Sequence, residues 1–245
     1  MSTSTKPPAE EITSLPRPKP KKKPFSSPNE MVTFIVGTGD KQEIFQIHKQ
    51  VACEHSEVWN RAFNSMFIEG QTQTYRIEDT DPEVFRLLTQ WVYRDNFDLF
   101  HSADLCTDRL DDLNVMVQCM REGGVLLRLW VLAEKFLIRR LQNYTMRVLC
   151  NKAVVCEPYP NRYDYRYVYK NTAEGSALRR FVIGQNCWGI AYSVHEEDLI
   201  FYSVEVLRDI IMALKRQLPE NFRARKRSQM IGNDYLVEEN PIIEP

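Results

Sequence analysis

The chain has 245 residues, a mass of 28.8 kDa, 43% hydrophobic residues and 27% charged residues, which is enough apolar material for one or two folded domains. This composition excludes fibrous, collagen-like and wholly disordered proteins. No apolar run approaches the ~20 residues that a membrane-spanning helix needs. The first thirty residues also lack the apolar core of a secretory signal, so we expect an intracellular protein of the nucleus, the cytoplasm or both.

The formal net charge of -1 gives the whole chain no strong field for attracting nucleic acid. Two local clusters are nevertheless basic, one in a Pro-rich leader at 1–30 that we expect to be a disordered arm, the other in an expected flexible tail at 220–245. Each cluster fits either a nuclear-import or phosphate-contacting role or a solvated surface. The clusters consist of Lys19, Lys21, Lys22 and Lys23, and of Arg223, Arg225, Lys226 and Arg227.

The six cysteines are scattered along the chain, and no two of them have the spacing CxxC. In a chain of this size such a distribution is typical of reduced, mostly buried thiols and not of a disulfide framework. The sequence therefore predicts free cysteines.

The first ordered pattern begins at Met31 and has a period of two residues. Apolar residues alternate over 32–36 and again over 45–47, and Gly37-Thr38-Gly39-Asp40 separates the two runs. This pattern predicts a β-hairpin. Tyr75 and Ile77 alternate in the same way and predict a further short strand.

Two helices are predicted around that strand. Ser56 can cap the first, whose buried stripe would contain Trp59, Ala62, Phe63 and Met66 and which Gly70 would close. The second begins at Asp81-Pro82, an N-cap followed by a residue already set for the first helical turn. Its expected buried residues are Val84, Leu87, Leu88 and Trp91.

An acidic insertion is predicted at 94–124, with apolar residues at helical spacing from Leu113 to Met120. This segment either covers an edge of the core or binds a partner. We expect Gly123-Gly124 to break the chain, and two core-facing helices to follow over 126–133 and 141–149.

The region 151–219 is predicted to be a mainly helical C-terminal extension. Tyr163, Tyr165, Tyr167 and Tyr169 alternate, which would place four rings on one side if the segment is extended. Packing against the protein's own helices is favoured over a stacking platform for single-stranded nucleic acid. Further on, Ser176 can cap a helix, and a last amphipathic helix is expected to bury Val206, Leu207, Ile210, Ile211 and Leu214.

No linear motif for catalysis or metal binding is complete. Gly37-Thr38-Gly39 lacks the third glycine of a dinucleotide loop, because Gln42 stands in its place. His195-Glu196 lacks the second histidine of HExxH, and His55-Ser56-Glu57 lacks a following PCxxC. We therefore expect no catalytic residue, no cofactor and no metal, hence no enzyme. An enzyme whose site assembles from distant positions stays as an alternative.

Specific residues in this order resemble the BTB/POZ domain over about 31–150. They are the FQIHK step out of the hairpin (45–49), the DPEVF helix start (81–85) and the LAEKF helix (132–136). The segment YKNTAEGSALRRF, which begins at Tyr169, resembles the region that follows this domain in BTB proteins of filamentous fungi. The resemblance implies an α/β (α+β) fold, in which helices flank a small sheet with a hairpin and a helical extension follows.

The same resemblance implies a protein-interaction scaffold that is often dimeric and often bridges a partner to a cullin ubiquitin ligase. Adaptors of the family contact the cullin partly through a hydrophobic-x-Glu element, which Phe67-Ile68-Glu69 matches. The alternative is that Phe67 is core and Glu69 only ends a helix.

For the family's dimer, Lys49 matches the basic residue, whereas Met31 stands where an acid is expected and Glu30 lies one residue early. Homodimerisation is therefore left open. A nuclear regulatory protein that contacts nucleic acid through 19–23 and 223–227 is the alternative function.

Overall fold

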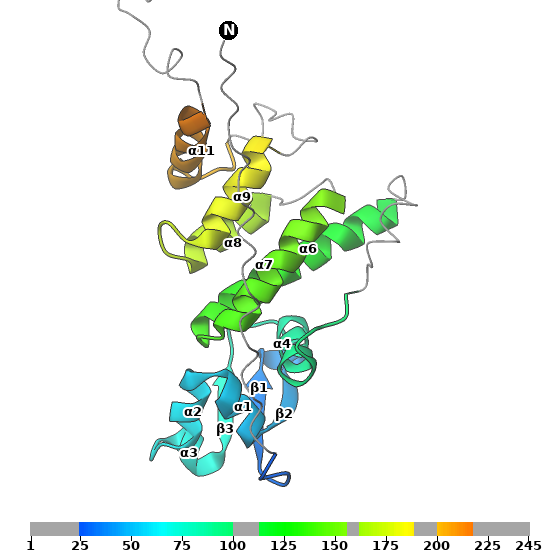
Figure 1. Ribbon diagram of the computed structural model, residues 1–245, viewed down its shortest axis with the longest axis vertical. Helices are drawn as coiled ribbons and strands as arrows, with labels where there is room; N and C mark the ends of the chain where they lie inside the picture. Colours follow the sequence, from blue (N-terminus) through cyan, green and yellow to red (C-terminus); the bar gives the residue numbers. More distant parts are fainter. Residues whose placement is uncertain (1–24, 100–112, 156–161, 189–199, 218–245) are drawn as a thin grey trace, which may run out of the picture.

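The computed structural model describes residues 25–99, 113–155, 162–188 and 200–217 (Figure 1). None of the helices in these ranges is both long enough and apolar enough to cross a membrane. In chain order the elements are β1 (Met31–Val36), a 3-10 turn η1 (Gly39–Lys41), β2 (Glu43–His48), α1 (Lys49–His55), α2 (Glu57–Phe63), α3 (Ile68–Thr72), β3 (Thr74–Ile77), α4 (Pro82–Arg94), α6 (Leu113–Lys135), α7 (Arg139–Val155), α8 (Arg162–Asn171), α9 (Ala177–Trp188) and α11 (Val204–Gln217).

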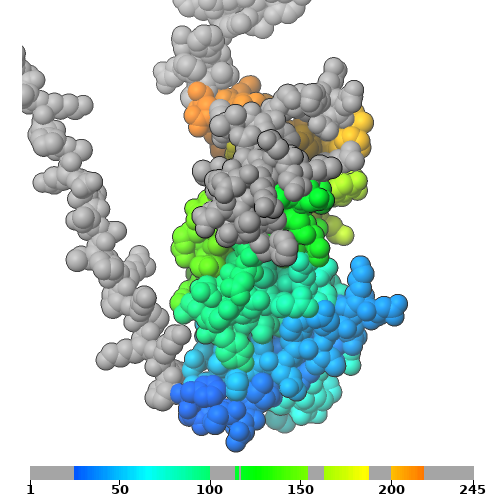
Figure 2. Space-filling model, turned by 90° about the vertical axis from the view of Figure 1, so that its right-hand side faces the viewer, coloured from blue at the N-terminus to red at the C-terminus, as the bar shows by residue number. Residues whose placement is uncertain are grey.

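These elements form an elongated molecule with the sheet at one end. The sheet and α1–α4 occupy the lower end in Figure 1, the α6–α7 pair lies in the middle, and α8, α9 and α11 form the upper end. The space-filling view in Figure 2 shows the same progression from blue to orange. The expected mixed fold with a small sheet and a helical extension is confirmed.

The predicted hairpin and third strand are both present in a three-stranded sheet of order β2-β1-β3. β1 pairs antiparallel with β2, with Phe34 opposite Phe45, and parallel with β3, with Phe34 opposite Tyr75. The hairpin turn uses Gly37 and Gly39 at φ of 85° and 57°, a backbone region that glycine enters without a steric cost. Gly37-Thr38-Gly39 is thus a turn and not a phosphate loop.

An aromatic cluster joins the sheet to the helices. The ring centroid of Phe34 lies 4.8 Å from that of Trp59 on α2 and 5.0 Å from that of Phe85 on α4. Trp59 in turn lies 4.9 Å from Phe136, just after α6. All four side chains are buried. Each of these large rings therefore buries apolar surface of its own element and of the element that it contacts.

The predicted caps at Asp81 and Ser56 are formed. The Asp81 carboxylate accepts a hydrogen bond of 2.9 Å from the backbone N–H of Glu83 at the start of α4. The hydroxyl of Ser56 accepts one of 3.2 Å from the backbone N–H of Trp59 and donates one of 2.7 Å to the carbonyl of Phe136. Ser56 is buried, and it therefore links the start of α2 to the α6–α7 turn.

The predicted break at Gly123-Gly124 is wrong, because α6 runs without interruption from Leu113 to Lys135. The glycine at 124 serves a close approach to α8: a Cβ there would lie 2.8 Å from Nη1 of Arg128 and 3.3 Å from Oδ1 of Asp164. The helix predicted within the insertion and the helix after it are one continuous helix.

A buried ion pair ties α6 to α7. Nζ of Lys152 lies 2.8 Å from a carboxylate oxygen of Glu122 and 3.3 Å from Sγ of Cys119. Cys119 is disulfide-bonded, so the expectation of free thiols is wrong for this residue, whereas Cys53, Cys150 and Cys187 are free. A disulfide depends on distance in space, which the spacing in the sequence does not reveal.

The tyrosine segment forms a helix, α8, so its four rings do not lie on one side as they would in an extended segment. Tyr165 and Tyr169, four residues apart, are buried on one face, and the hydroxyl of Tyr165 donates to the carbonyl of Val182 on α9. Tyr167 lies under the guanidinium of Arg128, at 4.9 Å, while Tyr163 is exposed. Residues at i and i+4 share a face in a helix as well as in a strand, so Tyr165 and Tyr169 lie together on α8 although the segment is not extended.

The last helices form as predicted, but α11 buries less than expected. Ser176 caps α9 by accepting a hydrogen bond from the backbone N–H of Leu178. The hydroxyl of Tyr169 on α8 donates to Asp209 on α11 at 2.8 Å. Of the apolar residues expected inside, Val206 is buried, whereas Ile211 and Leu214 are exposed.

Replacing Ser56 with alanine should destabilise the fold by more than the loss of an ordinary cap. The variant loses the cap bond and also leaves the Phe136 carbonyl without that donor, a total of about 2 to 3 kcal/mol. Urea unfolding followed by circular dichroism measures the loss. The matched control is Ser176→Ala, which loses a cap bond on α9 alone and should cost about 1 kcal/mol. Equal losses in the two variants would contradict the role of the Phe136 bond.

His55 should make the fold less stable in mild acid. Burial lowers the pKa of its imidazole below the usual 6.5, and the charge of Arg140 acts in the same direction while Asp95 opposes it. The unfolded chain then binds the proton more readily than the folded one. The contribution of neutral His55 to stability is present above the unfolded pKa and is lost as pH falls through the folded pKa. We expect His55→Gln to flatten the change in unfolding free energy between pH about 7.5 and about 5.5. A change of the same size in both proteins would refute this.

Candidate interaction surface

The candidate surface is built on the short connection between α2 and α3, residues 64–67. The backbone carbonyl of Phe63, the last residue of α2, accepts hydrogen bonds from Nζ of Lys49 at 3.2 Å and from the side-chain amide of Gln73 at 3.0 Å. The end of α2 leaves carbonyls without helical partners, and these two donors satisfy one of them. These two hydrogen bonds therefore hold the backbone in place where the connection begins.

Side chains within the connection hold its path. The hydroxyl of Ser65 donates to the carbonyl of Ala62 at 2.8 Å and accepts from the backbone N–H of Phe67 at 3.1 Å. Gly70 lies so close to this loop that a Cβ on it would be 2.0 Å from the carbonyl oxygen of Ser65. The prediction that Gly70 closes a helix is wrong: it lies inside α3, where its missing side chain permits the close packing.

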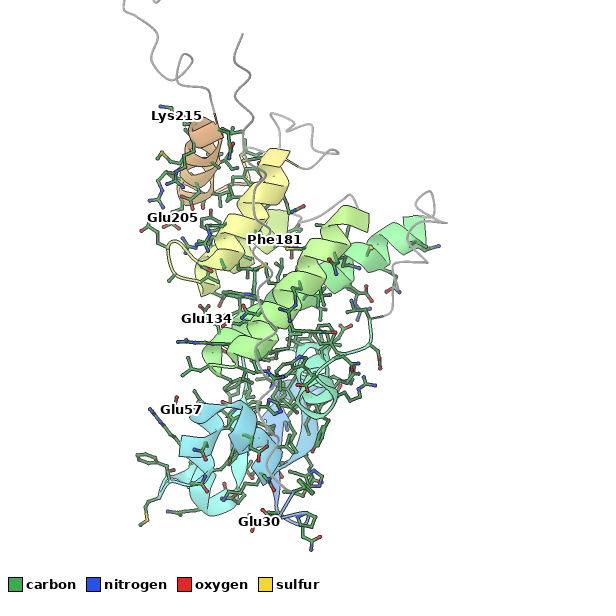
Figure 3. All side chains as sticks on the ribbon, in the orientation of Figure 1. Glu30, Glu57, Glu134, Phe181, Glu205 and Lys215 are labelled. Atoms are coloured by element: carbon green, nitrogen blue, oxygen red, sulfur yellow. The ribbon has the colours of Figure 1, made fainter. Side chains whose placement is uncertain are left out.

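This path leaves three consecutive apolar side chains in solvent, which we call the Met66–Ile68 patch. Met66 is 90% exposed, Phe67 76% and Ile68 64%. Figure 3 shows side chains of this region standing away from the sheet. The placement of Met66 on the buried stripe is wrong, because α2 ends at Phe63 and the stripe ends with it. The alternative that Phe67 lies in the core is wrong, because its side chain is exposed.

A groove adjoins the Met66–Ile68 patch between α3 and β3. Its volume is about 560 Å³, and its lining includes Ile35 on β1, Ile68, Glu69 and Thr72 on α3, and Tyr75 and Arg76 on β3. Burial raises the pKa of the Tyr75 hydroxyl, and the negative charges of Glu69 and Asp79 raise it further. The groove thus combines apolar side chains with one carboxylate and one guanidinium.

Among the described residues, the side chains of Lys49 and Glu30, the two candidates left open for a charged pair, do not form an ion pair with each other. The ammonium group of Lys49 donates to Phe63, and only the backbone joins Lys49 to Glu30, through an N–H donating to the Glu30 carbonyl at 2.8 Å. Lys49 therefore supports the base of the α2–α3 connection.

Within the described ranges, no three histidine, cysteine or acidic side chains come together as metal ligands. His55 packs against the edge of Trp91, with ring centroids 5.2 Å apart, and Nδ1 of His48 lies 2.8 Å from the hydroxyl of Tyr93. Both histidines thus contact aromatic side chains. His101, His195-Glu196 and the basic clusters at 19–23 and 223–227 lie outside the described residues.

Comparisons with known proteins identify the N-terminal half. The family model of the BTB/POZ domain matches residues 23–119. Among solved structures the BTB domain of zebrafish PATZ1 is similar, with 19% identity, a TM-score of 0.31, and coverage of 48% of this chain and 75% of that one. No curated protein matches the chain. The match over 23–119 spans the sheet, α1–α4 and the start of α6, and the chain therefore contains a BTB/POZ domain, a protein-interaction domain.

Proposed function

We propose that this protein is an adaptor whose BTB/POZ domain docks on a cullin-type ubiquitin-ligase scaffold through the Met66–Ile68 patch and Glu69. The observation that carries the proposal is the exposure of three consecutive apolar side chains on a loop that hydrogen bonds hold in place. Exposed apolar side chains that are contiguous and rimmed by polar groups are typical of protein-binding sites.

The patch is large enough to act as a binding hot spot. Fully burying one side chain such as phenylalanine, isoleucine or methionine is worth about 1.5 to 3 kcal/mol. Few such anchors are needed, because a handful of residues dominates the affinity of most interfaces. Phe67 has the largest of the three side chains, and we expect it to be the central anchor.

Preorganisation strengthens this argument. Binding costs free energy when it must order a loop, and a loop that is already ordered avoids this cost. The bonds of Ser65 and the side-chain amide of Gln71, which donates to the Met66 carbonyl at 2.8 Å, fix the backbone that displays the patch. Lys49 acts in the proposal by holding the Phe63 carbonyl at the base of the loop.

Glu69 supplies the polar part of the surface. It lies in the first turn of α3, directly after the patch, and also lines the groove beside Tyr75. A carboxylate at the rim of an apolar patch can pair with a basic group on the partner, and such pairs contribute to orientation and association rate. Phe67 and Glu69 together therefore reproduce a hydrophobic-x-Glu element on one accessible surface.

The helical extension is proposed to bind the cargo. α8, α9 and α11 lie at the end of the molecule opposite the sheet (Figure 1), so a partner on α11 leaves the Met66–Ile68 patch accessible. We also propose that the chain has four parts: an arm at 1–30, a BTB/POZ unit at 31–150 with an insertion at 94–124, an extension at 151–219 and a tail at 220–245.

The test is calorimetric titration of the full chain with the purified N-terminal domain of a cullin from the same organism. Phe67→Ala should weaken binding at least about tenfold, because it truncates the central anchor. Glu69→Lys should weaken it too, by reversing the charge at the rim. Circular dichroism checks that both variants fold.

A matched pair of substitutions provides the control. Ile68→Ala and Ile44→Ala remove the same atoms from side chains of nearly equal exposure, 64% and 66%. Only the first should weaken cullin binding, because Ile44 lies on β2 and belongs neither to the α2–α3 connection nor to the lining of the groove. Absence of cullin binding, or binding that none of the patch variants changes, would remove the adaptor proposal.

A further inference from the structure

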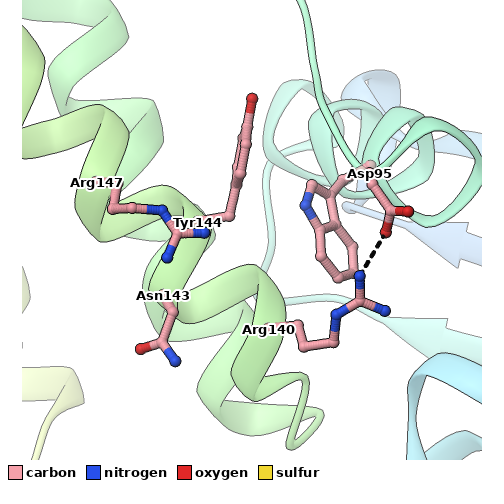
Figure 4. A pocket seen from close by; sticks show the side chains of 6 residues that line it. Asp95, Arg140, Asn143, Tyr144 and Arg147 are labelled. Atoms are coloured by element: carbon pink, nitrogen blue, oxygen red, sulfur yellow. Dashed lines mark hydrogen bonds and ion pairs between the residues drawn. The ribbon is translucent and has the colours of Figure 1, made fainter. Parts of the chain in front are cut away.

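A small pocket lies between the end of α4 and one face of α7, outside the Met66–Ile68 patch and its groove. Its volume is about 200 Å³. The lining residues are Trp91 and Asp95 from the end of α4, and Arg140, Asn143, Tyr144 and Arg147 from α7 (Figure 4). The four positions on α7 follow the spacing i, i+3, i+4 and i+7, which places them on one side of a helix.

The residues that line this pocket offer more hydrogen-bond donors than acceptors. The guanidinium of Arg140 lies 3.1 Å from a carboxylate oxygen of Asp95 and 5.7 Å from the ring centroid of Trp91. Arg147 and the amide of Asn143, by contrast, have no hydrogen-bond or ion-pair partner in the part of the chain that the structure describes. Asp95 thus neutralises one guanidinium, and Arg147 leaves the pocket with an excess positive charge.

A buried donor in the same lining also lacks an acceptor. Trp91 is only 2% exposed, and its indole N–H has no hydrogen-bond partner among the described residues. Leaving a buried donor unpaired costs free energy, so such groups in folded proteins call for an explanation. The hydroxyl of Tyr144 is likewise without a partner in the described ranges, and its ring packs edge-on against Phe97 at 5.1 Å.

We propose that the α4–α7 pocket binds an oxyanion, a carboxylate or phosphate group carried by a side chain of a protein partner. An oxyanion offers only hydrogen-bond acceptors. Its negative charge would pair with the guanidinium of Arg147, which has no ion-pair partner among the described residues. Guanidinium groups bind carboxylates and phosphates through charge-assisted hydrogen bonds, which are stronger than neutral ones.

The size of the pocket favours a single anionic group over a whole small-molecule ligand. Sites for drug-sized molecules have volumes of roughly 300 to 1,000 Å³, and this pocket has about 200 Å³. A phosphoserine or glutamate side chain on a peptide is of the right size. The inference does not depend on cullin docking, because it involves different residues on α4 and α7.

The test follows the indole N–H of Trp91 by ¹H–¹⁵N NMR of the labelled full chain. The chain has four tryptophans, and the Trp91 signal is the one lost in Trp91→Phe. Titration with inorganic phosphate, and separately with acetate, should shift this signal saturably. Sodium chloride at the same ionic strength should shift it much less, because a chloride ion lacks the several acceptor oxygens with which an oxyanion pairs a guanidinium.

Two arginine variants on the same helix give the control. Arg147→Ala removes the unpaired guanidinium and should weaken anion binding at least about tenfold, since hydrogen bonds to charged groups contribute about 1.5 to 3 kcal/mol. Arg139→Ala removes an equal charge from an exposed position of α7 that does not line the pocket, and it should change the affinity less than about twofold.

The source of the anion is then identified with three peptides that carry phosphoserine, glutamate or alanine at one position. The phosphoserine or the glutamate peptide should bind in an Arg147-dependent way, and the alanine peptide should not. The proposal is overturned if neither phosphate nor acetate shifts the Trp91 signal, or if Arg147→Ala and Arg139→Ala titrate alike.

Discussion

The packing of Trp59 is the interaction on which the rest of the structure depends. Its buried ring contacts Phe34 of the sheet on one side and Phe136 of the α6–α7 turn on the other. The hydroxyl of Ser56 reinforces the second of these contacts, because it caps α2 and also donates to the Phe136 carbonyl. Because two ring contacts and two hydrogen bonds hold α2, its position is set by the core and not by its own short length.

The exposed patch is a consequence of this anchoring. α2 has seven residues, and Phe63 at its end is buried against Phe34, with ring centroids 5.5 Å apart. The next three residues leave the core, and the bonds of Ser65 and the close approach of Gly70 turn the chain back into α3. Met66, Phe67 and Ile68 therefore face solvent because the residues around them are fixed, and not because the loop lacks contacts.

Local signals predicted much of the fold. Alternation gave β1 and β2, and side-chain oxygens at Ser56, Asp81 and Ser176 marked the starts of helices, because both signals act over a few residues. The errors arose where tertiary packing decides. Gly124 suggests a helix break in the sequence, but in the structure it permits close contact with α8. Met66 has the spacing of a buried helical residue, but its side chain is exposed because α2 ends before it. Phe67 and Glu69 could be named only from the family resemblance, and the pocket at Trp91 could not be found, since α4 and α7 meet only in space.

The arrangement of sites along the molecule bears on how an adaptor can work. A bridging protein needs two partner sites that do not compete for space. Here the Met66–Ile68 patch lies with the sheet at one end, and the apolar residues of α11 that remain exposed, among them Ile211 and Leu214, lie at the other. The α6–α7 pair between them is tied by the buried Lys152–Glu122 ion pair, whose rupture would leave an unpaired buried charge. In the proposed function, the α6–α7 pair joined by this ion pair separates the two ends, so that two partners could bind without competing for space.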